Sequence, residues 1–174
     1  MTLHANAVQV LTALPAGDRR DDFLAFLAAH PDALSRECAA GHLTASTLVV
    51  DPVNQRALLM LHRKVGKWLQ MGGHCESDDL TLREAAEREA REESGVEGLT
   101  LSDAPVNLDR HGLTCDGRAL DHLDVQYLAV IPMGARIEGN DESLGLQWFD
   151  FDCVPVDDTA VQRLVAAARR TLLI

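Results

Sequence analysis

The spacing of hydrophobic and polar residues changes near Gly41 and divides the chain into two parts. Before Gly41, the segments Ala5–Leu14 and Asp18–Ala29 carry apolar residues at helical spacing, and the second has aspartates in its first turn. We therefore predict an N-terminal helical extension over residues 1–41, followed by a larger domain over residues 42–174.

Short apolar runs bounded by turn residues follow Gly41, and they predict β-strands. The runs cover His42–Val50, Arg56–His62, Gln70–Cys75 (a short strand or a turn), Leu99–Leu108, Leu123–Ile131 and Leu146–Phe151. The turn residues Asp51-Pro52-Val53-Asn54 predict a hairpin between the first two runs. Helical spacing predicts a central helix over Thr81–Ser94 and a terminal amphipathic helix over Val161–Leu172. Strands on both sides of a central helix predict a mixed α/β sandwich.

The central helix has signals for both of its ends. Thr81 is suited to the N-cap position, and Glu84 three residues later completes a capping box. Gly95 is suited to the position after the last turn, where a left-handed backbone is common.

Three glutamates of this helix lie on its apolar side. Because a helix turns by about 100° per residue, Glu89, Glu92 and Glu93 share the sector of its leucine and alanines. Burying like charges on one face costs several kcal/mol unless something compensates. Magnesium binds through carboxylates and substrate phosphates, and it would compensate for these charges. The pattern therefore indicates a metal site.

A charged helix exposed to solvent is the alternative interpretation. Glu84 with Arg88, and Glu87 with Arg91, form favourable i,i+4 pairs on the outer side. Runs of charge are commonly solvated faces, so helical geometry alone leaves both interpretations open.

The residues around the helix favour the metal site, because they carry a longer motif. Gly72-Gly73-His74-Cys75-Glu76 leads through Asp78-Asp79 into Arg88-Glu89-Ala90-Arg91-Glu92-Glu93-Ser94-Gly95-Val96. From Gly73 to Val96 this resembles the Nudix box, a glycine and a glutamate-containing loop followed by Arg-Glu-apolar-x-Glu-Glu-x-Gly-apolar. The second half matches at every fixed position. In the first half, Asp79 stands where glutamate is usual, one extra residue separates it from Arg88, and Met71 replaces a common proline. Either the loop is one residue longer than the usual spacing, or the role of the acid passes to Asp78 or is lost.

The resemblance to the Nudix superfamily implies a fold and an activity. The fold is an α/β/α sandwich with a mixed sheet, to which the N-terminal helices are an addition. The activity is Mg²⁺-dependent hydrolysis of a diphosphate (pyrophosphate) linkage in a nucleoside diphosphate derivative, with water as the nucleophile and Mn²⁺ as a substitute metal. The box does not encode the specific substrate, because specificity lies in loops and added segments.

The same resemblance implies roles for the box residues. Glu89, Glu92 and Glu93 bind the divalent metal, and the Gly73 carbonyl is a further candidate ligand. Arg88 orients one of the glutamates through a salt bridge. Glu92, Glu93 and Arg88 are therefore the expected catalytic residues of the helix.

A general base often comes from a glutamate outside the box, and the acidic loop 138–143 offers two. Its position before the run Leu146–Phe151 resembles that of a late loop in the family. Glu142 is the first candidate and Glu138 the second. The alternative is a solvent-exposed acidic turn.

Four residues in or near the box are candidates for substrate binding: Gly73, His74, Arg63 and Trp68. Gly73 allows the backbone to approach a phosphate, and His74 lies beside it. Arg63 belongs to a basic cluster that could steer phosphates, and Trp68 could stack on a base. The alternatives are a solvated basic loop for Arg63 and simple packing for Trp68.

Other reactive side chains have weaker signals. His122 and Asp124 alternate along one predicted strand, so they form either a catalytic dyad or, as is more common, a hydrogen-bonded structural pair. Cys75 has no evident base partner, which argues against a nucleophilic role. The cysteines are far apart in the sequence and are expected to be reduced, mostly structural thiols: Cys38, Cys75, Cys115 and Cys153.

Charge and composition limit the partners. The chain has 174 residues and a formal net charge of −11, which disfavours nucleic acid but permits a small anion bound through cations. No apolar run approaches the roughly 20 residues of a membrane span, and the start lacks a signal-peptide pattern. We therefore expect a cytoplasmic protein without a membrane partner. A homodimer through the N-terminal helices is a further candidate arrangement.

Two other functions stay open. An isoprenoid-diphosphate isomerase on the same fold would need a cysteine facing a glutamate, and Cys75 is the only cysteine near the box. A non-catalytic nucleotide-binding module would typically have lost the box glutamates, and this chain keeps all three.

Overall fold

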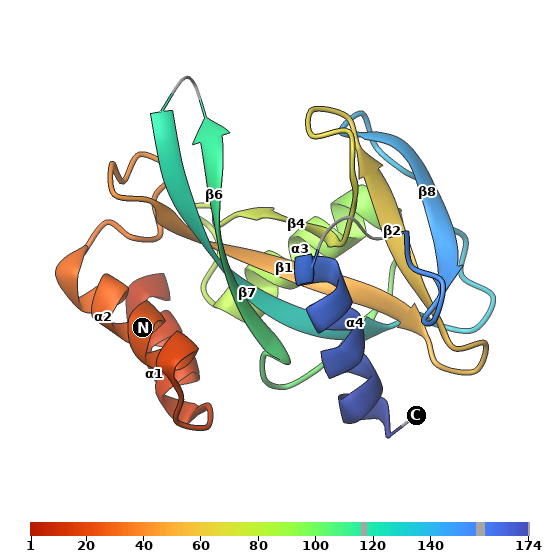
Figure 1. Cartoon of the computed structure of the whole chain (residues 1–174), viewed down its shortest axis with the longest axis horizontal. Helices are drawn as coiled ribbons and strands as arrows, with labels where there is room; N and C mark the ends of the chain where they lie inside the picture. The colour runs from red at the N-terminus through yellow and green to blue at the C-terminus, as the bar shows by residue number, and fades with distance from the viewer. Residues whose placement is uncertain (116–117, 156–158, 174) are drawn as a thin grey trace.

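The structure, a computed structural model, describes residues 1–115, 118–155 and 159–173, which form four helices and eight strands (Figure 1). The helices are α1 (Leu3–Ala13), α2 (Asp18–Ala29), α3 (Leu82–Ser94) and α4 (Thr159–Leu172). The strands are β1 (His42–Asp51), β2 (Arg56–His62), β3 (Trp68–Leu69), β4 (Met71–His74), β5 (Thr100–Leu101), β6 (Asn107–Cys115), β7 (Arg118–Val130) and β8 (Ser143–Asp150).

One mixed sheet contains all of these strands, with β1 and β7 at its centre. The two central strands run parallel, in register from His42 opposite His122 to Val50 opposite Val130. The other edge of β1 pairs antiparallel first with β4 and then with β2. In the same way, β7 pairs first with β6 and then with β5. β3 and β8 both pair with β2 and complete the sheet.

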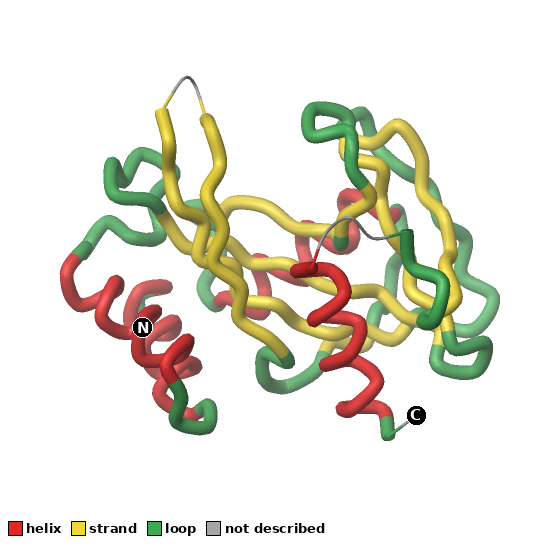
Figure 2. Tube along the Cα trace, viewed as in Figure 1, coloured by secondary structure: helices red, strands yellow, loops and turns green. Residues whose placement is uncertain are grey.

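Helices cover both faces of this sheet (Figures 1 and 2). α3 packs on the face toward which Leu43, Ala45 and Val49 of β1 point. α4 packs on the opposite face with Leu48 and Val50. This division follows from the two-residue period of a strand. The predicted α/β/α sandwich with a mixed sheet is confirmed.

The N-terminal helices α1 and α2 lie beside each other at one end of the molecule (Figure 1) and join the core on the α3 side of the sheet. Leu11 and Phe23 are completely buried there. The Asn6 side chain accepts a hydrogen bond of 2.9 Å from the backbone N–H of Leu82, the first residue of α3. Both predicted helices are therefore present, while the division at residue 41 stays a prediction.

Two strand predictions are wrong in their extent. The run Leu99–Leu108 forms two strands rather than one, because the chain leaves the sheet before Pro105, which has no N–H for a ladder bond. It rejoins the sheet where the Val106 N–H donates to the Gln126 carbonyl at 2.8 Å. β6 then continues to Cys115 and β7 begins at Arg118, well outside the predicted limits. The polar residues of this hairpin give no apolar alternation from which to predict it.

The predicted hairpin of β1 and β2 is confirmed, with Asp51 opposite Arg56. The Asp51 carboxylate accepts hydrogen bonds from the Asn54 amide at 2.7 Å and from the Arg56 guanidinium at 2.9 Å. Within the described residues, the structure contains no helix with the length and apolar character needed to cross a membrane.

We expect Asn6→Ala to lower the free energy of unfolding by about 1–2 kcal/mol, because the buried N–H at the start of α3 loses its acceptor. Chemical denaturation followed by circular dichroism measures this change. Gln9→Ala, at an exposed position of the same helix, is the control and should change the value by at most about 0.5 kcal/mol. Equal losses in the two variants would contradict the proposed contact.

Candidate functional site

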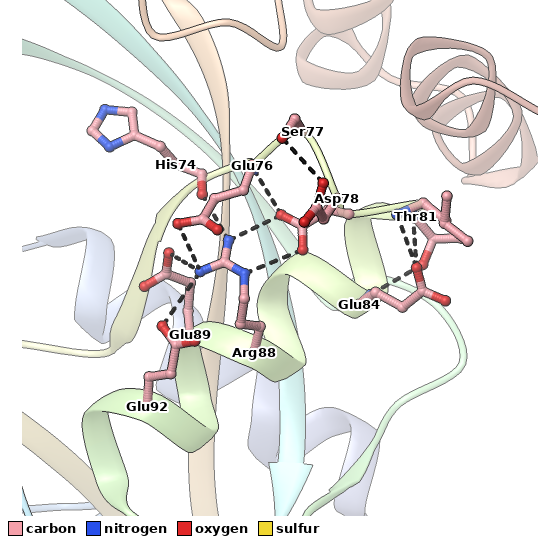
Figure 3. Close-up of polar contacts among 11 residues, drawn as sticks. His74, Glu76, Ser77, Asp78, Thr81, Glu84, Arg88, Glu89 and Glu92 are labelled. Atoms are coloured by element: carbon pink, nitrogen blue, oxygen red, sulfur yellow. Dashed lines mark hydrogen bonds and ion pairs between the residues drawn. The ribbon is translucent and has the colours of Figure 1, made fainter.

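Both ends of α3 are fixed as the sequence predicted. The Thr81 hydroxyl accepts a hydrogen bond of 3.0 Å from the Glu84 N–H, and the Glu84 carboxylate accepts one of 3.1 Å from the Thr81 N–H (Figure 3). Gly95 ends the helix in the left-handed region, with a φ of 68°. These caps fix which side chains the helix turns toward the sheet.

Glu93 is the most deeply buried acid of α3, with only 2% of its surface exposed. Its carboxylate accepts a hydrogen bond of 2.7 Å from the N–H of Gly72 on β4. Burial raises the pKa of Glu93 to about 8, and the negative charges of Glu89, Glu142 and Glu92 act in the same direction. A cation beside this carboxylate would stabilise its charged form.

Glu89 lies one turn before Glu93 and faces Gly73 of β4. A Cβ atom on Gly73 would come within 2.8–2.9 Å of the Glu89 carboxylate, so a larger residue would displace it. Burial raises the pKa of Glu89, and Arg88 partly offsets this effect. Glu92 differs, because half of its side chain (50%) is exposed. The prediction of a shared buried face is right for Glu89 and Glu93 and wrong for Glu92, which lies at the rim.

Arg88 joins the helix to the loop before it (Figure 3). Its guanidinium donates hydrogen bonds to the Asp79 carboxylate at 2.9 and 3.2 Å. It also donates to the Glu89 carboxylate at 2.9 Å and to the backbone carbonyl of His74 at 3.0 Å. Asp79 accepts a further bond of 2.7 Å from the Glu76 N–H. Asp79 therefore pairs with Arg88, although it is shorter than the usual glutamate and one extra residue separates the two.

Asp79 is the residue of this network to which sequence reasoning gave no role. Its position, counted from Gly73, is the one where the family motif has a glutamate, and that count was the available signal. Its carboxyl is buried, and the hydrogen bond from Arg88 lowers its pKa against the effect of burial. Asp79 is therefore charged and holds Arg88 in place.

The acidic loop before β8 is tied to β2 by Arg63. The Arg63 guanidinium donates to the backbone carbonyls of Asp141 at 2.8 Å and Ser143 at 3.2 Å. The Arg63 N–H donates to the Glu142 carbonyl at 2.9 Å. Arg63 therefore shapes the loop that carries Glu142, whereas its predicted contact with substrate stays a prediction.

The two candidates for the general base differ in their surroundings. The negative charge of Glu142 contributes to the raised pKa values of Glu89 and Glu93, so its side chain lies near them. Glu138 lies at the C-terminal end of α3, where its N–H donates to the Ser94 carbonyl at 2.7 Å. The geometry therefore favours Glu142.

His74 and Trp68 are also turned away from the Arg88 network. The His74 carbonyl faces Arg88, but its imidazole points to the other side (Figure 3), with its centroid 4.8 Å from that of His42. The Trp68 ring packs edge-on against Phe149 at a centroid distance of 5.0 Å. The predicted substrate contacts of His74 and Trp68 stay predictions.

The expected pairing of His122 with Asp124 is wrong. Asp124 is buried, and its carboxylate accepts hydrogen bonds from four other side chains: Thr44 at 3.0 Å, Ser46 at 2.7 Å, Gln70 at 3.2 Å and Gln126 at 2.8 Å. Instead, Nδ1 of His111 lies 2.9 Å from the Asp109 carboxylate. Sequence reasoning missed the polar cluster around Asp124, because Thr44, Ser46 and Gln70 are far from Asp124 in the sequence.

The cysteines are consistent with reduced structural thiols. Cys38 is buried, Cys75 is partly buried and Cys153 is exposed, and all three are free. Burial raises the pKa of Cys75 to about 12, so its thiol stays protonated near neutral pH. The side chain of Cys115 lies outside the described residues.

Carboxylate oxygens suited to a divalent cation therefore lie between α3 and β4. Glu93 is buried and Glu89 is partly buried, both have raised pKa values, and of the two only Glu89 is in close contact with the guanidinium of Arg88. A hard cation such as Mg²⁺ or Mn²⁺ prefers oxygen ligands and would neutralise this charge. The residues present fit such a metal.

Comparison with known proteins decides the family. The family model described as NUDIX domain matches residues 41–170. The chain belongs to the NUDIX family. No curated protein matches it.

Solved structures support the NUDIX assignment. A NUDIX-family hydrolase from Clostridium perfringens has a TM-score of 0.60 at 23% identity, over 75% of this chain and 97% of that chain. An Ap4A hydrolase from C. elegans has a TM-score of 0.61 at 17% identity, over 75% and 97%. A bifunctional NMN adenylyltransferase/ADP ribose pyrophosphatase from Francisella tularensis, complexed with AMP and a Mn ion, has a TM-score of 0.50 at 17% identity, over 88% and 48%. These likenesses confirm the predicted fold, and the matching family model confirms the predicted NUDIX class.

In the metal-free protein, we expect the free energy of unfolding to fall as the pH rises from about 4.5 to about 8. The folded protein holds the Glu93 proton up to a pKa of about 8, whereas the unfolded chain releases it near 4.5, so the stabilisation present at acid pH is lost across this window. Glu93→Gln should remove roughly 2–4 kcal/mol of this dependence. Urea denaturation with a chelator at a series of pH values measures it.

The matched control is Glu87→Gln, because Glu87 lies on the outer side of the same helix. Saturating Mg²⁺ should also flatten the pH dependence of the wild-type protein. An unchanged slope in Glu93→Gln would show that this carboxyl is not the titrating group.

Proposed function

We propose that this NUDIX protein is a Mg²⁺-dependent hydrolase that cleaves the diphosphate linkage of a nucleoside diphosphate derivative, with water as the nucleophile. The observation that carries the proposal is a pair of carboxylates, the buried Glu93 and the partly buried Glu89, against the Gly72-Gly73 backbone of β4. Such a pair is costly to bury without a cation, and the same cation would bind the phosphates of a substrate.

The box residues would hold the metal and position its ligands. Glu89 and Glu93 contribute carboxylates from the buried side, Glu92 contributes one from the rim, and the Gly73 carbonyl is a further candidate. Arg88 fixes the Glu89 carboxylate through the bond of 2.9 Å. A bound divalent cation neutralises the diphosphate, polarises phosphorus and lowers the pKa of the attacking water. Mn²⁺ shares the preference for oxygen ligands and is the expected substitute.

Glu142 is the proposed acceptor of the proton from water. It is exposed in a loop next to the box glutamates, and Arg63 holds that loop through three backbone carbonyls. A mobile carboxylate would be poorly positioned to accept the proton, and the reaction would be slower. The anchoring of the loop by Arg63 therefore favours a catalytic role for Glu142.

The substrate class is proposed from the relatives. One similar structure is an Ap4A hydrolase, and another is an ADP ribose pyrophosphatase complexed with AMP and a Mn ion. Both names describe nucleotides with linked phosphates. Trp68 and His74 are the proposed contacts to the base and a phosphate. A screen of nucleoside diphosphate derivatives with phosphate detection would identify the substrate.

The isomerase alternative has less support from the site. It would need an accessible cysteine facing a glutamate, and the thiol of Cys75 packs against the hydrophobic core with its pKa raised to about 12. A non-catalytic binding module would not explain why the chain keeps the carboxylates of Glu89 and Glu93 in a position where burial raises their pKa values. A cytoplasmic location, a homodimer through α1 and α2, and a separate extension over residues 1–41 remain proposals from the sequence.

We expect Glu93→Gln and Glu92→Gln each to lower kcat by at least about 100-fold, because each removes a charged oxygen from the metal site. Diphosphate cleavage is measured during a Mg²⁺ titration, so that weak metal binding is separated from loss of turnover. Glu87→Gln is the control on the same helix and should retain wild-type activity. A wild-type kcat for diphosphate cleavage in both site variants would contradict the metal-site proposal.

For the general base, we expect Glu142→Gln to lower kcat by about 10²–10⁴-fold and to remove the acidic limb of the pH–rate profile. Glu138→Gln is the matched control, four residues away in the same acidic loop. The Mg²⁺ dependence should be unchanged in Glu142→Gln, because this residue is proposed to accept a proton rather than to bind metal. A large loss in Glu138→Gln alone would reverse the assignment.

A further inference from the structure

Three histidines from separate strands meet on the sheet face opposite α3. They are His42 on β1, His74 at the end of β4 and His122 on β7. His42 lies directly opposite His122 in the parallel pairing, and His74 lies opposite Thr44, two residues from His42. The ring centroids are 4.5 Å apart for His42 and His122, 4.8 Å for His42 and His74, and 5.4 Å for His74 and His122.

Two of these imidazoles are buried, and three of their four ring nitrogens have no hydrogen-bond partner among the described residues. His42 is 2% exposed and His122 is 8% exposed. Within the described residues, Nδ1 and Nε2 of His42 have no hydrogen-bond partner, and Nε2 of His122 has none either. Buried polar groups in folded proteins are nearly always satisfied, so such a cluster calls for a missing partner.

We propose that His42, His74 and His122 form a binding site for a divalent transition metal of the zinc class, separate from the carboxylate site. One ligand nitrogen from each ring can be chosen so that all three lie within 4.8 Å of one another. Zinc–nitrogen bonds of about 2.0–2.1 Å require the rings to close in by small side-chain rotations. Three protein ligands leave a fourth position for water or another small ligand.

The neutral rings of the cluster are suited to a transition-metal cation. Burial lowers the pKa of His42 to about 4 and that of His122 to about 3, so both rings are neutral near pH 7. A neutral imidazole offers a lone pair to a metal, whereas it carries no positive charge to attract an anion. Imidazole ligands suit zinc, copper, iron and nickel, and carboxylates suit magnesium and manganese. The two sites would therefore select different metals.

Neighbouring groups support this orientation of the rings. His111, opposite His122 on β6, packs edge-on against it at a centroid distance of 5.7 Å. The Asp109 carboxylate lies 2.9 Å from Nδ1 of His111 and fixes that ring. The ring that packs beside His122 is therefore held by Asp109.

β4 connects this cluster to the Arg88 network. The His74 imidazole joins the histidines, and its backbone carbonyl accepts the hydrogen bond of 3.0 Å from Arg88 (Figure 3). A metal at the cluster would hold the ends of β1, β4 and β7 together. We expect it to stabilise the fold and to keep that carbonyl in position, independently of what the carboxylate site does.

A second group of potential ligands does not support the same inference. His30, Asp32 and Cys38 also lie close together, but His30 is partly exposed and Asp32 is exposed. The Asp32 carboxylate also interacts with the Cys38 thiol and raises its pKa. This group serves as the control.

The test is a titration of the metal-free protein with Co²⁺ as a visible probe for zinc, in excess Mg²⁺ to occupy the carboxylate site. We expect one equivalent of Co²⁺ to give an intense visible band typical of a four-coordinate site, and Zn²⁺ to displace it. Zn²⁺ should also raise the Tm. His42→Ala and His122→Ala should lose the band, and the double variant Glu89→Gln/Glu93→Gln should keep it.

Folding is checked in each variant by circular dichroism. If the buried variants do not fold, His74→Gln decides, because this ring is partly exposed, and we expect its Co²⁺ affinity to fall at least tenfold. The proposal is overturned by the absence of an intense band in the wild-type protein, by unchanged affinity in folded His74→Gln, or by loss of the band in His30→Ala or in the glutamate double variant. Because the readout is metal binding and Tm rather than cleavage, it does not depend on the proposed hydrolysis.

Discussion

The burial of two carboxylates against a strand backbone is the constraint on which the rest of the site depends. Glu89 and Glu93 lie one turn apart on α3. Glu89 fits against β4 because Gly73 has no side chain, and Glu93 accepts a hydrogen bond from the N–H of Gly72. Burial raises both pKa values, and of these two glutamates only Glu89 is in close contact with Arg88. The glycine pair, the arginine and the glutamates of the box therefore act together, because they place negative charge in a poorly solvated position. A bound cation would neutralise the charge that Arg88 does not.

Segments distant in the sequence keep this arrangement in place. Asn6 of α1 satisfies the first N–H of α3, so the N-terminal helices help to fix where the box helix begins. Asp79 holds Arg88 from the preceding loop, and Arg63 holds the acidic loop that carries Glu142. Each of these contacts restrains a loop or a helix end rather than the core. The core fixes the layers of the fold, whereas these polar contacts fix the position of the charges within it.

The sequence predicts the parts of the molecule that depend on local signals. Thr81, Glu84 and Gly95 mark the ends of α3 because capping acts within one turn, and the structure has both caps as expected. The burial of Glu92 was overestimated, since a helical wheel gives an angle but not the edge of the neighbouring sheet. β6 was missed because its polar residues carry no alternation. The histidine cluster was missed for a different reason: it depends on the register of three strands, which no local pattern encodes.

The alternation of β4 connects the two proposed metal sites. Successive residues of a strand point to opposite faces, so Gly73 faces the Glu89 carboxylate on the α3 side while His74 points to the histidines on the other side. One face then offers oxygen ligands to a hard cation and the other offers nitrogen ligands to a softer one. Because the His74 carbonyl binds Arg88, a change in the position of the His74 ring would move an acceptor of the arginine that orients Glu89. The backbone of a single residue is thus the shortest physical route between the two sites.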